Sequence, residues 1–256
     1  MSCLPLTAAL GRTQIIKPVR KVLIKNNLDE LGDAAAGLFV AIAIESIAMR
    51  GKFSVALAGG ATPRALYSLL GSDKYKKKVN WSKVTFFFGD ERNVPANADD
   101  SNYRMANETL LAPLGINAKK VHRWKTELEP TESAADYETR LRANGPLDLV
   151  LLGLGSDAHT ASLFPHTEAL KEKEKLAVAN WVEKLDDHRL TLTFPAINAA
   201  QDVMFLVSGK EKADAVAGVL EGESRPDDLP AQRVKPTSGN LFWLFDLAAA
   251  SGLKGP

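Results

Sequence analysis

The chain has 256 residues, of which 45% are hydrophobic and 25% charged, a composition typical of a globular protein with one large α/β domain. Its 32 basic and 31 acidic residues give a formal net charge of +1, which does not favour a nucleic-acid or membrane surface. The single cysteine, Cys3, excludes a disulfide framework and a thiolate metal site, and it favours a reducing, cytoplasmic compartment.

Residues 1–18 are predicted to form a flexible N-terminal segment, and residues 19–256 a single domain. The opening "MSCLPLTAALGRTQ" has no basic part before its short apolar part, so it is not typical of a signal peptide. No apolar run approaches the roughly 20 residues of a membrane span, and a soluble protein is expected. Four scattered histidines offer no familiar ligand spacing, so no metal is expected.

Strand-like and helix-like stretches alternate along the chain. Apolar, β-rich runs predict strands over 21–25, 53–58, 84–88, 147–152, 189–194, 203–208 and 241–245. Helical patterns cover 29–50, 62–70, 101–111, 131–143 and 209–222. Thr62 is the expected N-cap of the second helix, with Pro63 at its first position, and Thr131 is the expected cap of the fourth. The alternation predicts a doubly wound, mostly parallel sheet flanked by helices, Rossmann-like, with a subsidiary strand pair within 176–200.

Three polar, glycine-containing loops each follow a predicted strand. They are "AGGATPR" (58–64), "GDERNVP" (89–95) and "GLGSDAH" (153–159). In an open α/β sheet the carboxyl ends of parallel strands face the ligand crevice. The three loops are therefore expected to meet at one site.

The first two loops are suited to a phosphate. Gly59 and Gly60 allow close backbone approach, and the start of the helix at Thr62 favours an anion, although a tight turn would use the same glycines. No G-K-[ST] follows, so this is not a P-loop. In "GDER" the Arg92 guanidinium is a bidentate phosphate donor braced by Asp90 and its neighbouring glutamate; an internal ion pair is the alternative.

The third loop reads as G-x-G-x-x-A, the pattern of a dinucleotide-binding turn. The acid expected about 20 residues later is replaced by the run "EALKEKEK", and Pro165 interrupts the helix that should follow. A nucleotide cofactor is therefore not expected. An oxidoreductase would instead be stabilised by NAD or NADP.

His159 is the best candidate for a catalytic group. It lies two residues after Asp157, which either orients the imidazole or caps a short helix whose first turn contains the histidine. The helix dipole would then favour the neutral imidazole, which acts as a base. The sequence has no nucleophile elbow, so the nucleophile is predicted to be water. Arg189, at the start of "RLTLTFP", either reaches the same crevice or pairs at the surface.

The whole chain resembles the 6-phosphogluconolactonase family. The resemblance rests on "GGATPRALY", "FFFGDERNVP", "DDSNYRMANETLL", "LDLVLLGLGSDAHTASLFP", "RLTLTFPAINAA", "FLVSGKEK" and "LPAQRVKPTSGNLFWLFD", in that order. It implies cofactor-free hydrolysis of 6-phospho-D-glucono-1,5-lactone to 6-phosphogluconate in the pentose phosphate pathway. The small sugar-phosphate lactone is the only partner that it implies, and a monomer is the simplest state.

Carried over residue by residue, the resemblance makes His159 the base and Asp157 its partner. It associates Arg92 and Arg189 with the substrate phosphate, and Gly59, Gly60 and Thr62 with the phosphate-facing turn. Arg64 stands where many members have lysine. Ala158 replaces a glycine of the family's G-x-D-G-H pattern, which would strain the turn if φ is positive there.

Two alternatives share these motifs. Glucosamine-6-phosphate deaminase/isomerase resembles the chain around "GDE" and "GSDAH", but it continues into "AFNEP", with an essential glutamate five residues after the histidine. Phe164 occupies that position here, which favours the lactonase. A non-catalytic sugar-phosphate-binding module would keep the glycines and arginines and tolerate loss of His159.

Overall fold

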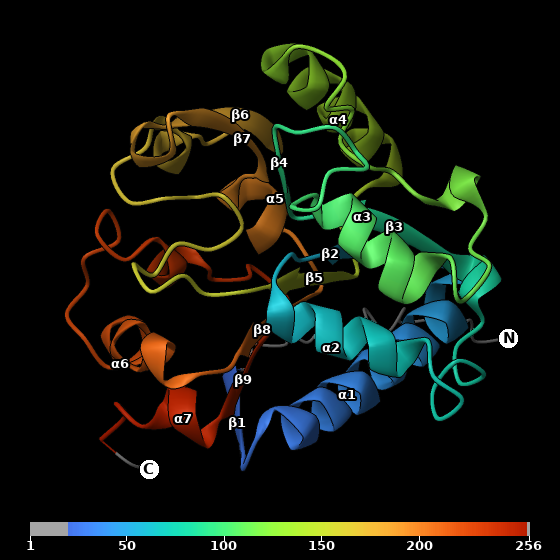
Figure 1. Ribbon diagram of the computed structural model, residues 1–256, viewed down its shortest axis with the longest axis horizontal. Helices are drawn as coiled ribbons and strands as arrows, with labels where there is room; N and C mark the ends of the chain where they lie inside the picture. The colour runs from blue at the N-terminus through green and yellow to red at the C-terminus, as the bar shows by residue number, and fades with distance from the viewer. Residues whose placement is uncertain (1–19, 255–256) are drawn as a thin grey trace, which may run out of the picture.

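A computed structural model describes residues 20–254, so the segment predicted over 1–18 and Cys3 lie outside the described residues. A six-stranded sheet with every neighbouring pair parallel runs through the molecule (Figure 1). Its spatial order is β1-β9-β8-β5-β2-β3. The strands are β1 (Arg20–Lys25), β2 (Phe53–Leu57), β3 (Val84–Phe88), β5 (Leu149–Leu152), β8 (Asp202–Val207) and β9 (Asn240–Asp246). The predicted α/β fold, a mostly parallel sheet flanked by helices in one domain, is confirmed.

Helices connect and cover the strands. They are α1 (Leu28–Arg50), α2 (Ala61–Leu70), α3 (Asn102–Ala106), α4 (Pro130–Asn144), α5 (Phe194–Asn198), α6 (Ala213–Leu220) and α7 (Leu247–Ala250). By length and composition α1 is apolar enough to cross a membrane, which the inspection of apolar runs did not anticipate. In the fold it packs against β1, β2, β9 and α2, and it buries residues such as Phe39.

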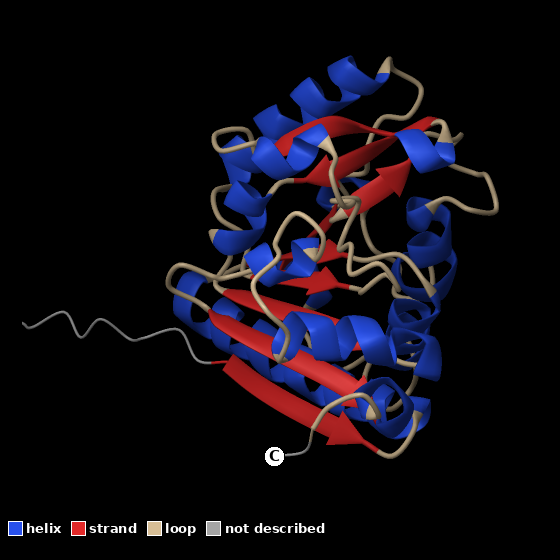
Figure 2. Cartoon of the chain, turned by 90° about the vertical axis from the view of Figure 1, so that its left-hand side faces the viewer, coloured by secondary structure: helices blue, strands red, loops and turns tan. Residues whose placement is uncertain are grey.

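A second, antiparallel sheet is formed by β4 (Asp90–Arg92), β7 (Asp187–Leu192) and β6 (Ala177–Val182). It lies at the top of the molecule in Figure 2, above the large sheet, and α4 packs against it. The predicted strand pair within 176–200 is confirmed. One detail was wrong: Asp90–Arg92 is a short strand rather than a loop. The strand predicted at 189–194 is part of the confirmed pair, as β7.

The order of the large sheet contains one topological switch point. The connection after β2 leads to β3 on one side, and the connection after β5 leads to β8 on the other side, while β2 and β5 are neighbours. Ligands of open α/β sheets bind outside the carboxyl ends of the strands at such a point. The loops that follow β2 and β5 therefore flank the expected ligand crevice.

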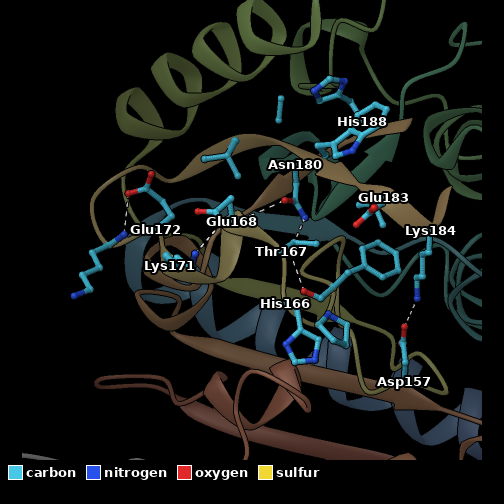
Figure 3. Close-up of a pocket in the computed structure, with 18 of the residues that line it drawn as sticks. Asp157, His166, Thr167, Glu168, Lys171, Glu172, Asn180, Glu183, Lys184 and His188 are labelled. Carbon is cyan, nitrogen blue, oxygen red and sulfur yellow. Dashed lines mark hydrogen bonds and ion pairs between the residues drawn. The ribbon is translucent and has the colours of Figure 1, made fainter. Parts of the chain in front are cut away.

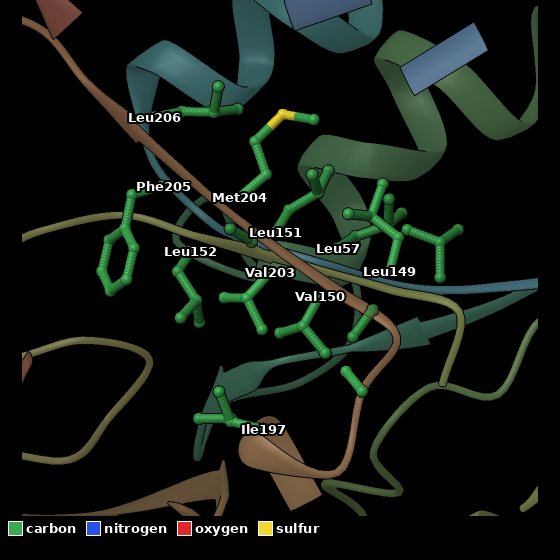
Figure 4. Packing of buried hydrophobic residues seen from close by; sticks show 14 of the residues in the cluster. Leu57, Leu149, Val150, Leu151, Leu152, Ile197, Val203, Met204, Phe205 and Leu206 are labelled. Carbon is green, nitrogen blue, oxygen red and sulfur yellow. The ribbon is translucent and has the colours of Figure 1, made fainter. Parts of the chain in front are cut away.

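The core is centred on the middle strands. Every residue of β2 and β5 is buried, as is all of β8 except its first residue, Asp202. Figure 4 shows their side chains projecting from both faces of the sheet, for example Val150, Leu151 and Met204. Continuous apolar strands are expected where both faces are covered, as the sequence indicated.

The helix starts differ from the predicted caps. α2 begins at Ala61 with Gly60 as its N-cap, so Thr62 does not cap it and Pro63 is its third residue. α4 begins at Pro130, not after Thr131. In both cases the backbone of a turn sets the start, and no side chain caps the helix. The pattern at 209–222 is divided into a 3₁₀ turn, Lys210–Lys212, and α6.

Candidate active site

A cleft of about 280 Å³ lies at the carboxyl ends of β2, β3 and β5. All three predicted loops contribute to it, so their expected convergence is confirmed. The lining residues are Ala58, Gly59, Gly60, Gly89, Asp90, Arg92, Asn102, Leu151, Leu152, Gly153, Leu154, Gly155, His159, Thr160, Ala161 and Lys212.

Two buried tyrosines fix the points where the loops leave the sheet. The Tyr67 hydroxyl accepts from Ala58 N and donates to Ala58 O, both at 2.8 Å. The Tyr137 hydroxyl does the same for Phe88, with distances of 2.6 Å to N and 3.0 Å to O. Each phenol therefore satisfies both backbone groups of one residue at a strand's end, where ladder partners are lost. The turns after β2 and β3 start from rigid positions.

The turn after β2 requires glycine for space and for conformation. A Cβ on Gly59 would lie 2.0 Å from the Asn102 side-chain oxygen, so only glycine allows Asn102 to pack there. Gly60 has φ +100°, which side-chain-bearing residues rarely adopt. The tight-turn and ligand-binding interpretations are therefore both compatible with this segment.

The acids of "GDER" hold the site together. Glu91 is buried and accepts hydrogen bonds from the backbone N–H groups of Arg92, Asn102 and Tyr103 at 2.8–2.9 Å. Burial raises the pKa of Glu91, and these three donors offset the effect only in part. Asp90 accepts from Asn102 and, at 2.7 Å, from the Ser162 hydroxyl. Glu91 thus braces the start of α3, and Asp90 ties β4 to the loop after β5.

The loop after β5 is a tight turn rather than a short helix, so the predicted helix-dipole effect on His159 does not apply. Gly155 N donates to His159 O at 2.8 Å, and Ala158 N donates to Gly155 O at 3.0 Å. A Cβ on Gly155 would lie 2.0 Å from His159 Nδ1, so glycine is required beneath the imidazole. Ala158 is buried with φ +60°, as expected where a glycine has been replaced.

His159 and Asp157 form a hydrogen-bonded pair. The His159 Nδ1 to Asp157 Oδ1 distance is 2.5 Å, and the same oxygen accepts from His159 N at 3.2 Å. Partial burial alone would raise the pKa of Asp157, but hydrogen bonds from His159 and Lys184 outweigh burial and hold it well below its usual range. An ionised Asp157 accepts the Nδ1 proton, which leaves the lone pair of the neutral ring on Nε2.

Phe164 packs against this pair. Its ring stacks on the His159 imidazole with centroids 4.1 Å apart. The position compared above with the glutamate of the deaminase is thus filled by an aromatic ring in contact with His159.

The predicted phosphate ligands are placed unequally. Arg92 lines the cleft, and in the β4–β7 pairing it stands directly opposite Arg189. Two cations facing each other across a strand pair repel, and a bound anion would relieve that repulsion. Arg189 is held by Asp187 at 2.5 Å and is not among the cleft-lining residues; neither are Thr62 and Arg64, and Arg64 is exposed.

Two cleft residues were missed by sequence reasoning. Lys212 follows β8, so the rule that selected the other loops, a polar segment after a parallel strand, also selects it. Asn102 lies in α3, and only its contact with Gly59 and Asp90 brings it to the cleft. Within residues 20–254, no group of three His, Cys, Asp or Glu side chains is arranged to hold a metal ion.

Comparison with known proteins identifies the family of the chain. Residues 26–243 match the family model of glucosamine-6-phosphate isomerases/6-phosphogluconolactonase. The chain is 38% identical to 6-phosphogluconolactonase of Nostoc sp., over 95% of this chain and 99% of the relative. The solved 6-phosphogluconolactonase of Trypanosoma brucei superposes with a TM-score of 0.80 at 32% identity, covering 93% of this chain and 99% of that one.

A monomeric glucosamine-6-phosphate deaminase has the same fold, with a TM-score of 0.78 at 22% identity over 91% of this chain and 99% of that one. The fold alone therefore does not separate the two activities. The extent of the sequence match decides membership: the chain belongs to the glucosamine-6-phosphate isomerase/6-phosphogluconolactonase family.

Proposed function

We propose that the protein hydrolyses 6-phospho-D-glucono-1,5-lactone to 6-phospho-D-gluconate, the second step of the pentose phosphate pathway. The observation that carries the proposal is the His159–Asp157 pair, with His159 on the wall of a cleft that also presents Arg92 and Lys212. Identity to 6-phosphogluconolactonases over almost the whole chain supports the same reaction. We expect the reaction to take place in the cytoplasm, with the monomer as the active form.

His159 acts as the general base. Its Nε2 takes a proton from water as the water oxygen attacks the lactone C1 carbonyl. When the tetrahedral intermediate collapses, the bond between C1 and the ring oxygen breaks and the imidazolium returns its proton to that oxygen. The products are a hydroxyl group and a carboxylic acid, which ionises. Asp157 stabilises the imidazolium between the two proton transfers.

Backbone N–H groups of the same loop are assigned to the developing oxyanion. Those of Gly155 and Ala158 already donate to carbonyls inside the loop, so the assignment falls on Gly153 and Leu154, which line the cleft.

The substrate phosphate is assigned to the opposite end of the cleft. Arg92, Lys212 and the Gly59–Gly60 turn supply charge and backbone donors there. Arg189 and Thr62 do not line the cleft. Arg189 reaches the phosphate only if it leaves Asp187. Asp90 is assigned to holding the loop through Ser162, not to chemistry.

The deaminase is the alternative activity. Its ring opening and proton relay need a carboxylic acid where Phe164 stacks on His159. A benzyl ring neither donates nor accepts a proton. Lactone hydrolysis does not use that acid, so the contact favours the lactonase.

The deciding experiment follows acid release from freshly generated 6-phosphogluconolactone, corrected for spontaneous hydrolysis. The wild-type protein should accelerate it, and His159→Ala should lower turnover by about 10²- to 10⁴-fold while remaining folded. Acceleration by both proteins would keep the activity and remove His159 as the base. No acceleration by the wild type, with ammonia release from glucosamine 6-phosphate, would establish the deaminase instead. Binding without turnover of either substrate would indicate a sugar-phosphate-binding module.

The phosphate assignment has a separate test. Arg92→Ala should raise KM for the phosphorylated lactone by about 10- to 10²-fold, as expected for loss of a charged hydrogen bond. Unphosphorylated gluconolactone should be affected much less. Arg189→Ala provides the comparison, and equal losses on both substrates would mean that the arginines are structural.

A further inference from the structure

Asp157 separates two cavities. The cleft holds His159, whereas Asp157 lines a second and larger cavity of about 1030 Å³ between β6–β7 and the segment 164–174 (Figure 3). Its Oδ1 binds His159, and its Oδ2 is bound from the side of the larger cavity. The Asp157 carboxylate that binds His159 therefore faces the larger cavity with its Oδ2 atom.

Lys184 binds this Oδ2 atom. This lysine lies in the 3₁₀ turn Glu183–Leu185 that joins β6 to β7, and its Nζ pairs with Asp157 Oδ2 (Figure 3). The same ammonium group lies over the Phe164 ring, 4.6 Å from its centroid. Phe164 in turn stacks on His159. Four side chains from two separate segments thus form a closed ring of contacts: His159, Asp157, Lys184 and Phe164.

We propose that Lys184 is a positioning residue for the reaction proposed above. It holds Asp157 from behind and places a cation beside the carboxylate that contacts His159. The inference rests on the proposed function only for its kinetic readout. Lys184 contacts neither the imidazole nor the cleft in the structure, so it acts through Asp157 and Phe164.

Stability alone does not explain this arrangement. The Lys184 and Asp157 side chains are 53% and 31% exposed, and ion pairs of this exposure contribute about 0–1 kcal/mol to folding. Lys184 contacts the carboxylate that binds His159, so its charge has a larger effect on the proton affinity of the imidazole than on stability. It offsets the negative charge that would otherwise stabilise the imidazolium. The other charged groups that line the cleft with His159 are Asp90, Arg92 and Lys212.

Lys184→Met removes the cation and keeps an apolar stem against Phe164. The full charge of Asp157 then acts on the imidazolium, so the midpoint of the His159 ring titration should move up by about 0.3 to 1 pH unit. The acid limb of the kcat/KM profile should move in the same direction. With the carboxylate free to rotate, kcat above that limb should fall by about 3- to 10-fold.

Two matched variants control for charge and packing. Lys184→Arg keeps the cation and should stay within about 2-fold of wild type in kcat, without a shift of the titration. Lys171→Met removes an exposed lysine from the same cavity, one that pairs with Glu168 and touches neither Asp157 nor His159. It should leave both readouts unchanged.

The His159 titration is read from ring Cε1–H resonances, with His159→Gln identifying its signal among the four histidines. An unmoved midpoint in Lys184→Met overturns the proposal, even if activity falls, because the loss would then reflect packing alone. Equal behaviour of Lys184→Met and Lys171→Met also overturns it. If the wild type does not hydrolyse the lactone, the proposed function fails, but the titration still decides the role of Lys184.

Discussion

Two aspartates border the same strand, and they differ in almost every physical respect. Asp148 precedes β5 and is buried, and its carboxylate accepts four hydrogen bonds from Ser54 and Arg50 at 2.6–3.0 Å. Asp157 follows β5 in a strained turn, a third exposed, and its side-chain partners are His159 and Lys184. Asp148 joins β5 to β2 and α1, whereas Asp157 contacts the imidazole of His159, the proposed base.

From this difference we expect stability to depend on the amino end of β5 and chemistry on its carboxyl end. At the amino end of β5, the Asp148 carboxylate is satisfied by Ser54 and Arg50. At the carboxyl ends, two tyrosines and Glu91 hold the backbone, while the groups facing the cleft stay accessible. Substitutions at the two ends should therefore affect different measurements.

The largest effect on folding is expected from Asp148→Ala. Ser54 N–H, which is buried, would lose its acceptor, while Arg50, 39% exposed, is able to turn to solvent. An unsatisfied buried donor and a broken, partly buried ion pair together predict a loss of about 3 kcal/mol in the free energy of unfolding. Urea denaturation measures this loss. Turnover per folded molecule should not change, and a catalytic defect in the folded fraction would remove the proposed division between the two ends.

Asp157→Asn should give the opposite result. The amide keeps the shape of the carboxylate and one acceptor oxygen but has no charge to balance the imidazolium, so kcat should fall by about 10²-fold, or about 2.7 kcal/mol in activation free energy. The unfolding free energy should stay within about 0.5 kcal/mol, because the ion pair is exposed. Steady-state kinetics and denaturation on one preparation measure both. A stability loss as large as that of Asp148→Ala would contradict the comparison.

Ala158 tests how much strain the turn at the site tolerates. Ala158→Val places a β-branched side chain at φ +60° in a filled space and should cost about 2 kcal/mol and lower activity. Ala158→Gly relieves the strain but loses a buried methyl group and gains freedom in the unfolded state, so its net effect should lie within about 1 kcal/mol of zero. Thermal unfolding and kcat compare the two. Equal stability of the valine and glycine variants would mean that the turn is not strained.

The smallest effect is expected for Glu127, a carboxylate that lies at neither end of β5. Glu127 is 55% exposed, and hydrogen bonds from Arg123 lower its pKa to about 2. A lowered pKa stabilises the fold above the unfolded value of 4.5, and that contribution is lost as pH falls toward 2. After discounting for exposure, Glu127→Gln should cost at most about 0.5 kcal/mol at neutral pH. Urea titrations at several pH values should show the difference from wild type shrinking below about pH 4.5; a constant difference would rule out this pair as its source.

The sequence was informative where one local rule decides the outcome. The apolar runs predicted all six strands of the large sheet. For the middle strands the reason is that a strand buried on both faces must be apolar throughout. The glycine loops after β2, β3 and β5 met at one cleft, because parallel strands present their carboxyl ends to the same edge. The N-cap predictions were wrong. Thr62 and Thr131 are good N-cap residues, but the turns before α2 and α4 start those helices one residue or more earlier.

The sequence by itself thus predicted the fold class and the edge of the sheet where the polar loops meet, and it offered pairing with His159 as one of two roles for Asp157; the structure shows the pair. Only the tertiary structure decided that Asn102 packs against Gly59, that Arg92 faces Arg189, and that Lys184 closes the ring around Asp157. The physical reason is the distance along the chain. Periodicity and spacing report interactions over a few residues, whereas these contacts join segments whose meeting depends on how the two sheets pack.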